Sequence, residues 1–226
     1  MSRAVFVAGI WLLAVADPSA GFAGDLPYAG FCFTASAPLD SASSDASLKA
    51  IRDQTGATHI EIVVERYQTY LNSTVIAPPA VPVSNTTQLL HAIRTINRLG
   101  MQAVLKPHVE CKCGVWRAHI EMASAADWNT WFVDYYMPYI VEMAQLSHEQ
   151  DLPALNIGTE LGGTTGQEAH WRDLIKQVRA VYKGKLWYGA NWGSYIWEVA
   201  WFDAVDYIGC DAVRFSIDFR LMFNFD

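Results

Sequence analysis

Six short apolar runs alternate with longer stretches of helical periodicity along most of this chain. The runs occupy residues 28–33, 58–64, 101–105, 154–157, 185–190 and 207–210. Helical periodicity covers residues 47–54, 87–98, 125–149, 169–182 and 196–204. Strands that alternate with helices in this way predict βαβ units and a parallel sheet. Because the chain has no glycine-rich dinucleotide fingerprint, a (β/α) barrel is favoured over an open, doubly wound sheet.

A complete barrel of this type needs eight strand–helix units and about 250 residues. The chain has 226 residues and holds about six such units. We therefore predict an α/β fold of the (β/α)8 TIM-barrel type that is incomplete, with open sheet edges at the first and sixth strands. Pro138 is expected to kink or split the longest helix.

The first 23 residues have the parts of a secretory signal peptide. Arg3 supplies the positive start, residues 5–15 the apolar stretch, and Gly21-Phe22-Ala23 a small-residue cleavage site. We expect a signal peptide over residues 1–23, a partial barrel over 24–212 and an atypical tail over 213–226. The tail alternates apolar and polar residues with the period of a strand. The mature protein is expected to be secreted, periplasmic or extracellular, and not to lie in a membrane.

The charge and composition of the chain limit the classes of partner that it can bind. The net charge is −7 and the chain has no basic run, which argues against nucleic acid or an anionic membrane surface as a partner. Nine tryptophans indicate stacking on sugar rings, core packing, or both. The aromatic residues that recur at helical spacing are interpreted as core; they are Trp128, Trp131, Phe132 and Tyr135.

Four cysteines are consistent with an oxidising compartment. Cys111 and Cys113 are too close for the usual zinc spacing, so a loop disulfide from one of them is expected. Cys32 and Cys210 lie on predicted core strands and are expected to be buried thiols. We expect no cofactor and no metal.

Glu160 follows the fourth apolar run and precedes the glycine-rich turn 162–166. A strand, an acid and a turn into a helix place this carboxylate at the carboxyl end of a strand, where barrel enzymes carry their chemistry. The alternative is a solvated glutamate at the edge of a loop. The surrounding strand ends bear on this choice.

Read together, the strand ends carry an ordered set of short motifs. They are Leu105-Lys-Pro-His108, Trp116-Arg117, Ile157-Gly-Thr-Glu-Leu161, Trp171-Arg-Asp-Leu-Ile175, Val178-Arg-Ala-Val-Tyr182, Tyr188-Gly-Ala-Asn-Trp192 and Asp206-Tyr-Ile-Gly-Cys-Asp-Ala212. Over residues 28–212 this set resembles glycoside hydrolase family 113, a family of retaining β-mannanases on the (β/α)8 barrel. The resemblance implies a polysaccharide or oligosaccharide substrate and two catalytic glutamates, on strands four and seven.

The resemblance assigns roles to individual residues. It implies that Glu160 is the general acid/base, which matches the need of retaining hydrolysis for a carboxyl group that donates and later accepts a proton. Sugar hydroxyls would be bound by Lys106, His108, Arg117 and Asn191, while Trp192 would stack on a sugar ring and Asp211 would position its neighbours at the rim. Alternatively, His108 is a structural rim residue, Arg117 pairs with Glu110 or Glu121, and Trp192 packs in the core.

The resemblance stops at Ala212, before the position of the strand-seven nucleophile. Only Asp218 and Asp226 are carboxylates beyond Asp211, and neither lies in a matching motif. A retaining hydrolase without its nucleophile loses nearly all turnover. We therefore expect an impaired glycoside hydrolase of the retaining β-mannanase type that acts on a β-linked polysaccharide. The alternatives are a carbohydrate-binding pseudoenzyme and a non-functional truncated product.

Overall fold

The computed structural model describes residues 14–15, 29–80, 85–192 and 194–211. The alternating tail and most of the expected signal segment lie outside these residues. Within them, six parallel strands form the centre of the fold. They are β2 (Gly30–Phe33), β3 (His59–Gln68), β4 (Gln102–Cys111), β5 (Ala154–Thr159), β6 (Lys185–Asn191) and β7 (Tyr207–Asp211).

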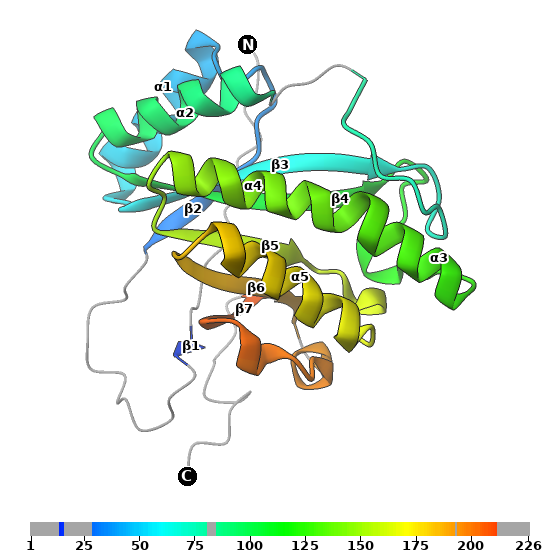
Figure 1. Ribbon diagram of the computed structural model, residues 1–226. Coiled ribbons are helices and arrows are strands. Elements are labelled where there is room, and N and C mark those ends of the chain that lie inside the picture. Colours follow the sequence, from blue (N-terminus) through cyan, green and yellow to red (C-terminus); the bar gives the residue numbers. More distant parts are fainter. Residues whose placement is uncertain (1–13, 16–28, 81–84, 193, 212–226) are drawn as a thin grey trace.

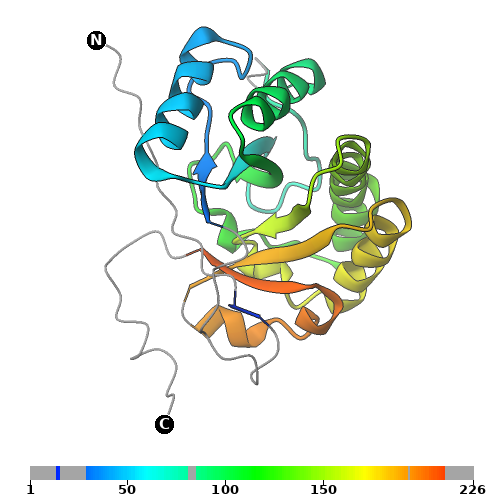
Figure 2. The ribbon, with the colours of Figure 1, turned by 90° about the vertical axis from the view of Figure 1, so that its left-hand side faces the viewer.

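Sheet order follows chain order from β2 to β7, and every neighbouring pair among these six strands is parallel. The sheet is curled, with helices on its outer face (Figures 1 and 2). This arrangement is the predicted incomplete (β/α)8 barrel. β7 is not a fully open edge, because the two-residue strand β1 (Ala14–Val15) pairs with it antiparallel. These two residues belong to the segment expected to be a signal peptide, whose removal stays a prediction.

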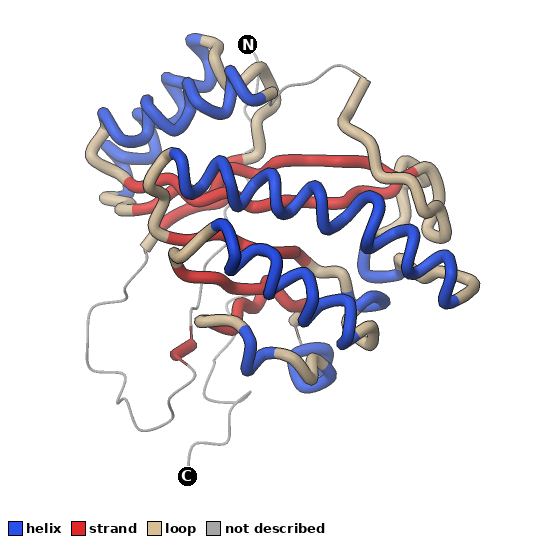
Figure 3. Tube along the Cα trace, viewed as in Figure 1, coloured by secondary structure: helices blue, strands red, loops and turns tan. Residues whose placement is uncertain are grey.

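Helices and short helical turns connect the strands (Figure 3). The α-helices are α1 (Ala42–Thr55), α2 (Thr86–Arg98), α3 (Ala125–Asn129), α4 (Met137–Glu149) and α5 (Glu168–Val181). The shorter pieces are the π-helix η2 (Thr130–Tyr136) and the 3₁₀ turns η1 (Arg117–His119), η3 (Gly162–Thr164), η4 (Ser194–Glu198) and η5 (Phe202–Ala204).

Capping explains why α1 begins five residues before the predicted start. Ser41 accepts a hydrogen bond from the backbone N–H of Ser44, and Gly56 ends the helix in the left-handed conformation. The first turn is rich in serine and alanine, so it shows no apolar periodicity. α2 begins with a reciprocal capping box between Asn85 and Gln88.

The longest predicted helix is split just before Pro138, as predicted. The π-helix η2 precedes the break, and α4 begins with the proline in its first turn, where a missing N–H costs little. The predicted helix over 196–204 is wrong, because the chain forms the two 3₁₀ turns η4 and η5 instead. Between them Trp201 is fully buried, and its Nε1 donates to the carbonyl of Thr165 over 3.1 Å.

The outer face of the sheet is covered by aromatic side chains from η2, α4 and α5. Trp131 stacks on Tyr136 with ring centroids 4.6 Å apart, and Trp171 stacks on Trp201 at 4.5 Å. The expected core residues Trp128, Trp131 and Phe132 are buried, but Tyr135 is only partly buried and Tyr136 lies in the core instead. An α-helical period places Tyr135 on the buried face. Residues 130–136 instead form a π-helix, which has more residues per turn and brings Tyr136 to that face.

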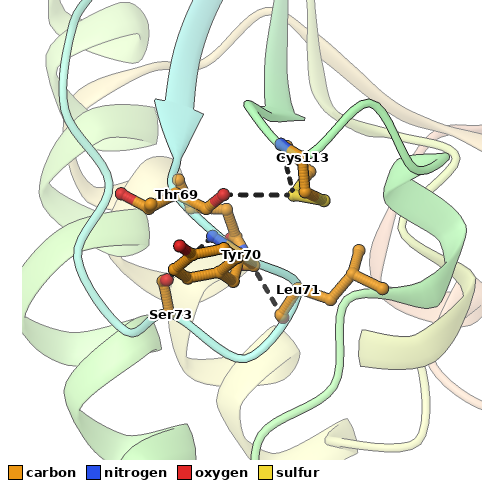
Figure 4. The surroundings of a disulfide bond; sticks show 7 residues. Thr69, Tyr70, Leu71, Ser73 and Cys113 are labelled. Carbon is orange, nitrogen blue, oxygen red and sulfur yellow. Dashed lines mark hydrogen bonds between the residues drawn. A yellow bond between two sulfur atoms is a disulfide. The ribbon is translucent and has the colours of Figure 1, made fainter.

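Cysteine pairing is local. Cys111 and Cys113 are joined to each other by a disulfide at the end of β4, beside the turn 69–73 that follows β3 (Figure 4). That turn is held by Gln68, whose Nε2 donates to the carbonyls of Tyr70 and Leu71 over 2.8 and 3.0 Å. Cys32 and Cys210 are free thiols, and they are partly buried rather than fully buried as predicted, because both strands lie at the ends of the parallel sheet.

Candidate active site

Glu160 lies directly after β5, at the carboxyl end of the strand. Its backbone N–H donates to the carbonyl of Gly189 on β6 over 2.7 Å. Its φ of 51° is left-handed, a conformation that a non-glycine residue adopts at a cost and that is enriched at functional sites. The residue is only 6% exposed. The structure therefore fixes the direction of this side chain through its backbone.

Two donors from the loop after β4 hold the Glu160 carboxylate. Trp116 Nε1 donates to Oε2 over 3.2 Å, and Arg117 Nη2 donates to the same oxygen over 3.0 Å. Burial raises the pKa of Glu160, and Arg117 and Trp116 only partly offset that rise. The carboxyl group thus retains its proton to a higher pH than an exposed glutamate does.

Arg117 is shared between two carboxylates. Its Nη1 donates to Glu110 Oε1, while its Nη2 contacts Glu160. His108 Nδ1 lies 3.2 Å from the same Glu110 oxygen. The expected alternative that Arg117 pairs with Glu110 is thus observed together with its contact to Glu160. Burial, followed by the charge of Arg117, holds the pKa of His108 well below its usual value, so this imidazole is neutral at pH 7.

Asn191 is the last residue of the neighbouring strand β6, and Trp192 follows it. Asn191 Nδ2 lies 3.5 Å from the Glu160 carbonyl oxygen, so the two residues meet through the backbone. Trp192 is 49% exposed, so the alternative prediction that it packs in the core is wrong. Several buried polar atoms in this region have no hydrogen-bond partner among the described residues; they are His108 Nε2, Arg117 Nε, Asn156 Nδ2, Thr159 Oγ1 and Asn191 Oδ1.

Lys106 and Asp211 belong to a second cluster on the inner face of the sheet. Lys106 is 3% exposed, and its Nζ lies 3.0 Å from Asp211 Oδ1 and 3.4 Å from Glu61 Oε2. Cys32 Sγ donates to Glu61 Oε2 over 3.3 Å. Burial raises the pKa of Glu61 to about 8. One ammonium group therefore faces two carboxyl groups, of which Glu61 is protonated at neutral pH.

The sequence-predicted site residues thus fall into two groups. Glu160, Arg117, His108 and Asn191 surround the end of β5, whereas Lys106 and Asp211 pair with each other; the sugar contacts expected of all of them stay a prediction. Sequence reasoning missed Glu61 and Cys32 and treated Glu110 only as a possible partner. Glu61 had one visible signal, since it is a charged residue inside the otherwise apolar run 60–64.

The described residues hold no group of three His, Cys, Asp or Glu side chains that could bind a metal ion. No helix in this part of the chain has the length and apolar character needed to cross a bilayer.

A buried carboxyl group with a raised pKa, at the carboxyl edge of a parallel barrel sheet, is an arrangement that (β/α) barrel glycoside hydrolases use. The model of glycoside hydrolase family 113 matches residues 31–219, and the chain belongs to that family. The match extends seven residues beyond the resemblance seen in the sequence, into residues outside the described ones.

Two solved structures that align with this chain are GH113 β-mannanases. A GH113 β-1,4-mannanase aligns with a TM-score of 0.73 at 24% identity, over 79% of this chain and 60% of its own. The mannanase AaManA from Alicyclobacillus acidocaldarius, in complex with ManMIm, aligns with a TM-score of 0.74 at 24% identity, over 80% and 60%. The chain therefore spans about three fifths of these relatives. A search of curated protein sequences gave no match.

Proposed function

We propose that this chain carries the acid/base half of a retaining β-mannanase site, with β-linked mannan as substrate and Glu160 as the proton donor. The observation that carries the proposal is a buried carboxyl group with a raised pKa, held by Trp116 and Arg117 at the end of β5. Family membership and the mannanase neighbours support the substrate class. Such a group can protonate the leaving glycosidic oxygen and then deprotonate water.

We also infer that these 226 residues turn over slowly on their own. Among the residues that the structure describes, the two other carboxylates close to Glu160 are each bound to a cation: Glu110 contacts Arg117, and Asp211 contacts Lys106. Neither is therefore the unpaired second carboxylate that a retaining hydrolase uses as its nucleophile. Without a nucleophile the covalent glycosyl-enzyme cannot form, so the chain would bind substrate but cleave it slowly.

Chemical rescue tests both statements together. Azide can take the role of the nucleophile: it attacks the anomeric carbon of an activated aryl β-mannoside, the bond to the aryl oxygen breaks, and an α-mannosyl azide forms. We expect azide to accelerate aryl release roughly tenfold or more. With a poor leaving group, Glu160→Gln should lower the rescued rate about 10²–10⁴-fold, because the departing oxygen then receives no proton. High activity without azide would contradict the impairment, and rescue unaffected by Glu160→Gln would contradict the assignment.

A carbohydrate-binding pseudoenzyme is the second candidate, and the exposed tryptophans favour it. Trp116, Trp192 and Trp197 all lie in segments that follow strands, as Glu160 does, and all three are exposed. Titration calorimetry with manno-oligosaccharides should then detect binding that Trp192→Ala weakens, without azide-rescued cleavage. Absence of both binding and rescue, with a non-cooperative melt, would identify a non-functional truncated product.

We further propose that the protein is exported. The signal-like segment over residues 1–23 supports this, as does a disulfide, which persists in oxidising compartments. Expression of the chain with its first 23 residues, followed by mass measurement of the protein outside the cytoplasm, tests cleavage directly. Recovery only in the reduced cytoplasmic fraction would contradict the proposal.

A further inference from the structure

We propose that Glu110 is a positioning residue for Glu160: it holds Arg117 in place and balances its charge, so that the guanidinium orients the acid without keeping it ionised. This inference rests on the role proposed for Glu160. In this proposal Glu110 acts on Glu160 through Arg117, which contacts both carboxylates.

The geometry forms a continuous chain of contacts. Arg117 binds Glu110 through Nη1 and Glu160 through Nη2, so one planar group spans both carboxylates. His108 Nδ1, 3.2 Å from the same Glu110 oxygen, holds that carboxylate from the other side. Arg117 and His108 are both largely buried, which keeps water from replacing these contacts.

Charge balance explains why a second carboxylate is needed. An arginine beside a buried acid favours the ionised form and commonly lowers the pKa of that acid by one to three units. A general acid requires the opposite, because it must hold its proton until the glycosidic bond breaks. Burial raises the pKa of Glu110 as well, while the charge of Arg117 lowers it. In its ionised form Glu110 balances the charge of Arg117, and burial remains the largest cause of the raised pKa of Glu160.

Other ionisable groups around the pair do not supply this balance. Lys106 on β4 and Asp211 on β7 act on Glu160 with opposite signs and are bound to each other. Two further ionisable groups among the described residues interact with Glu160, Cys210 on β7 and Tyr188 on β6, and both have raised pKa values that keep them neutral. Near Glu110, Tyr67 on β3 donates to Glu65 over 2.6 Å.

Trp116 provides a direct readout of this balance. Its indole N–H donates to Glu160 Oε2, so the ¹H–¹⁵N resonance of that group should shift as Glu160 ionises. We expect a pH titration of the ¹⁵N-labelled full chain to show the midpoint above the ordinary value of a glutamate, with Trp116→Phe identifying the resonance. An indole resonance that does not titrate would overturn the proposal, because the contact on which it rests would be absent.

The variants test the role of Glu110. Glu110→Gln should lower the midpoint by about one pH unit, since Arg117 then acts unopposed on Glu160. Glu110→Asp should restore most of the native value, and Glu121→Gln, an exposed carboxylate near Arg117 in sequence, is the matched control that should leave it unchanged. A midpoint that stays constant or rises in Glu110→Gln would overturn the proposal.

A double variant shows whether Glu110 acts through Arg117. Arg117→Met should raise the midpoint, and adding Glu110→Gln to it should change little further. An equally large downward shift in that background would mean that Glu110 acts directly and not through Arg117. Dispersed spectra confirm that each variant is folded before its midpoint is compared.

This readout is independent of turnover. Failure of azide rescue with a normal Glu110→Gln shift would reject the proposed hydrolysis and leave the role of Glu110 standing. Successful azide rescue together with an unshifted midpoint in Glu110→Gln would support the proposed hydrolysis and reject the role of Glu110. Where rescue is measurable with a poor leaving group, the rescued rate of Glu110→Gln should begin to fall at a lower pH than that of the native chain. With an activated leaving group, which needs no proton, the two pH profiles should coincide.

Discussion

The two faces of the curled sheet treat their polar atoms in opposite ways. On the outer face, the large aromatic rings are buried and their polar groups are bound: Trp131 donates to Gln68 over 2.9 Å, and Trp171 donates to the Thr164 carbonyl over 3.0 Å. On the inner face and at the strand ends, ionisable groups are buried, and some of their atoms have no hydrogen-bond partner in the part of the chain that the structure describes, including Glu61 Oε1 and His108 Nε2.

This difference separates stability from chemistry. A satisfied aromatic layer stabilises the fold through area removed from water and ring packing. A buried, incompletely satisfied polar layer costs free energy and is retained where it serves binding or proton transfer. The comparison predicts that substitutions outside weaken folding, whereas substitutions inside change the pH dependence of folding or of the site.

The largest effect is expected on the outer face. Trp171→Ala should lower the free energy of unfolding by about 3–5 kcal/mol, because it removes a fully buried ring that contacts Phe132, Tyr188 and Trp201. Urea denaturation measures this. Trp197→Ala is the matched control: this ring is 74% exposed, and its loss should change stability by less than about 0.5 kcal/mol. Equal losses would erase the distinction between the two faces.

The inner cluster should respond to loss of its cation. Lys106→Met leaves Glu61 and Asp211 without the ammonium group, and breaking such a buried pair costs about 3 kcal/mol at pH 8. The cost should be smaller at pH 5, below the pKa of Glu61, where this carboxyl group is protonated and uncharged. Denaturation at the two pH values checks this, and adding Glu61→Gln should recover part of the loss. A cost independent of pH would mean that packing, not charge, is what Lys106 provides.

Protonation of Glu61 should by itself make stability depend on pH. Burial raises its folded-state pKa from 4.5 to about 8, so between these values the folded chain holds a proton that the unfolded chain has released. This contribution is fully present below pH 4.5 and is lost as pH rises through 8. Glu61→Gln should flatten this part of the curve relative to the native chain. A native curve already flat compared with the variant would contradict the raised pKa.

The smallest effect is expected from the disulfide. Cys111 and Cys113 are two residues apart, and so small a loop removes little entropy from the unfolded chain, roughly 1–2 kcal/mol. Reduction should lower the melting temperature slightly and leave the melt cooperative. The double variant Cys111→Ser/Cys113→Ser should not respond to the reductant, which makes it the control. Loss of cooperativity on reduction would place the turn 69–73 and this loop in the stabilising layer.

Sequence reasoning succeeded where the signal is local. The six parallel strands and the acid at the end of the fourth follow from apolar runs bounded by glycine and helical stretches, as at Ala154–Thr159 and Glu160. It failed where a local period changes: η2 moved the buried position from Tyr135 to Tyr136, and the burial of Trp201 replaced an expected helix by two short turns.

Contacts within the site were less predictable because they join distant residues. Arg117 and Glu160 are 43 residues apart, and Lys106 and Asp211 are 105 apart. No spacing in the sequence indicates that Glu61 will face Lys106, or that one guanidinium will be shared by Glu110 and Glu160. The structure therefore changed Lys106 from an expected sugar ligand into a residue held between two carboxyl groups, while its contact with sugar stays a prediction.

The amino-acid order by itself determined the sequence of strands and helices, the capping residues, and a glutamate at the edge where the strands end. These depend on neighbours a few positions apart, through side-chain periodicity and backbone preference. Only the tertiary structure decided which charges are buried together and which polar atoms remain unbound. That outcome depends on strand register and on the curvature of the sheet, because the energy of a charge is set by what surrounds it in space.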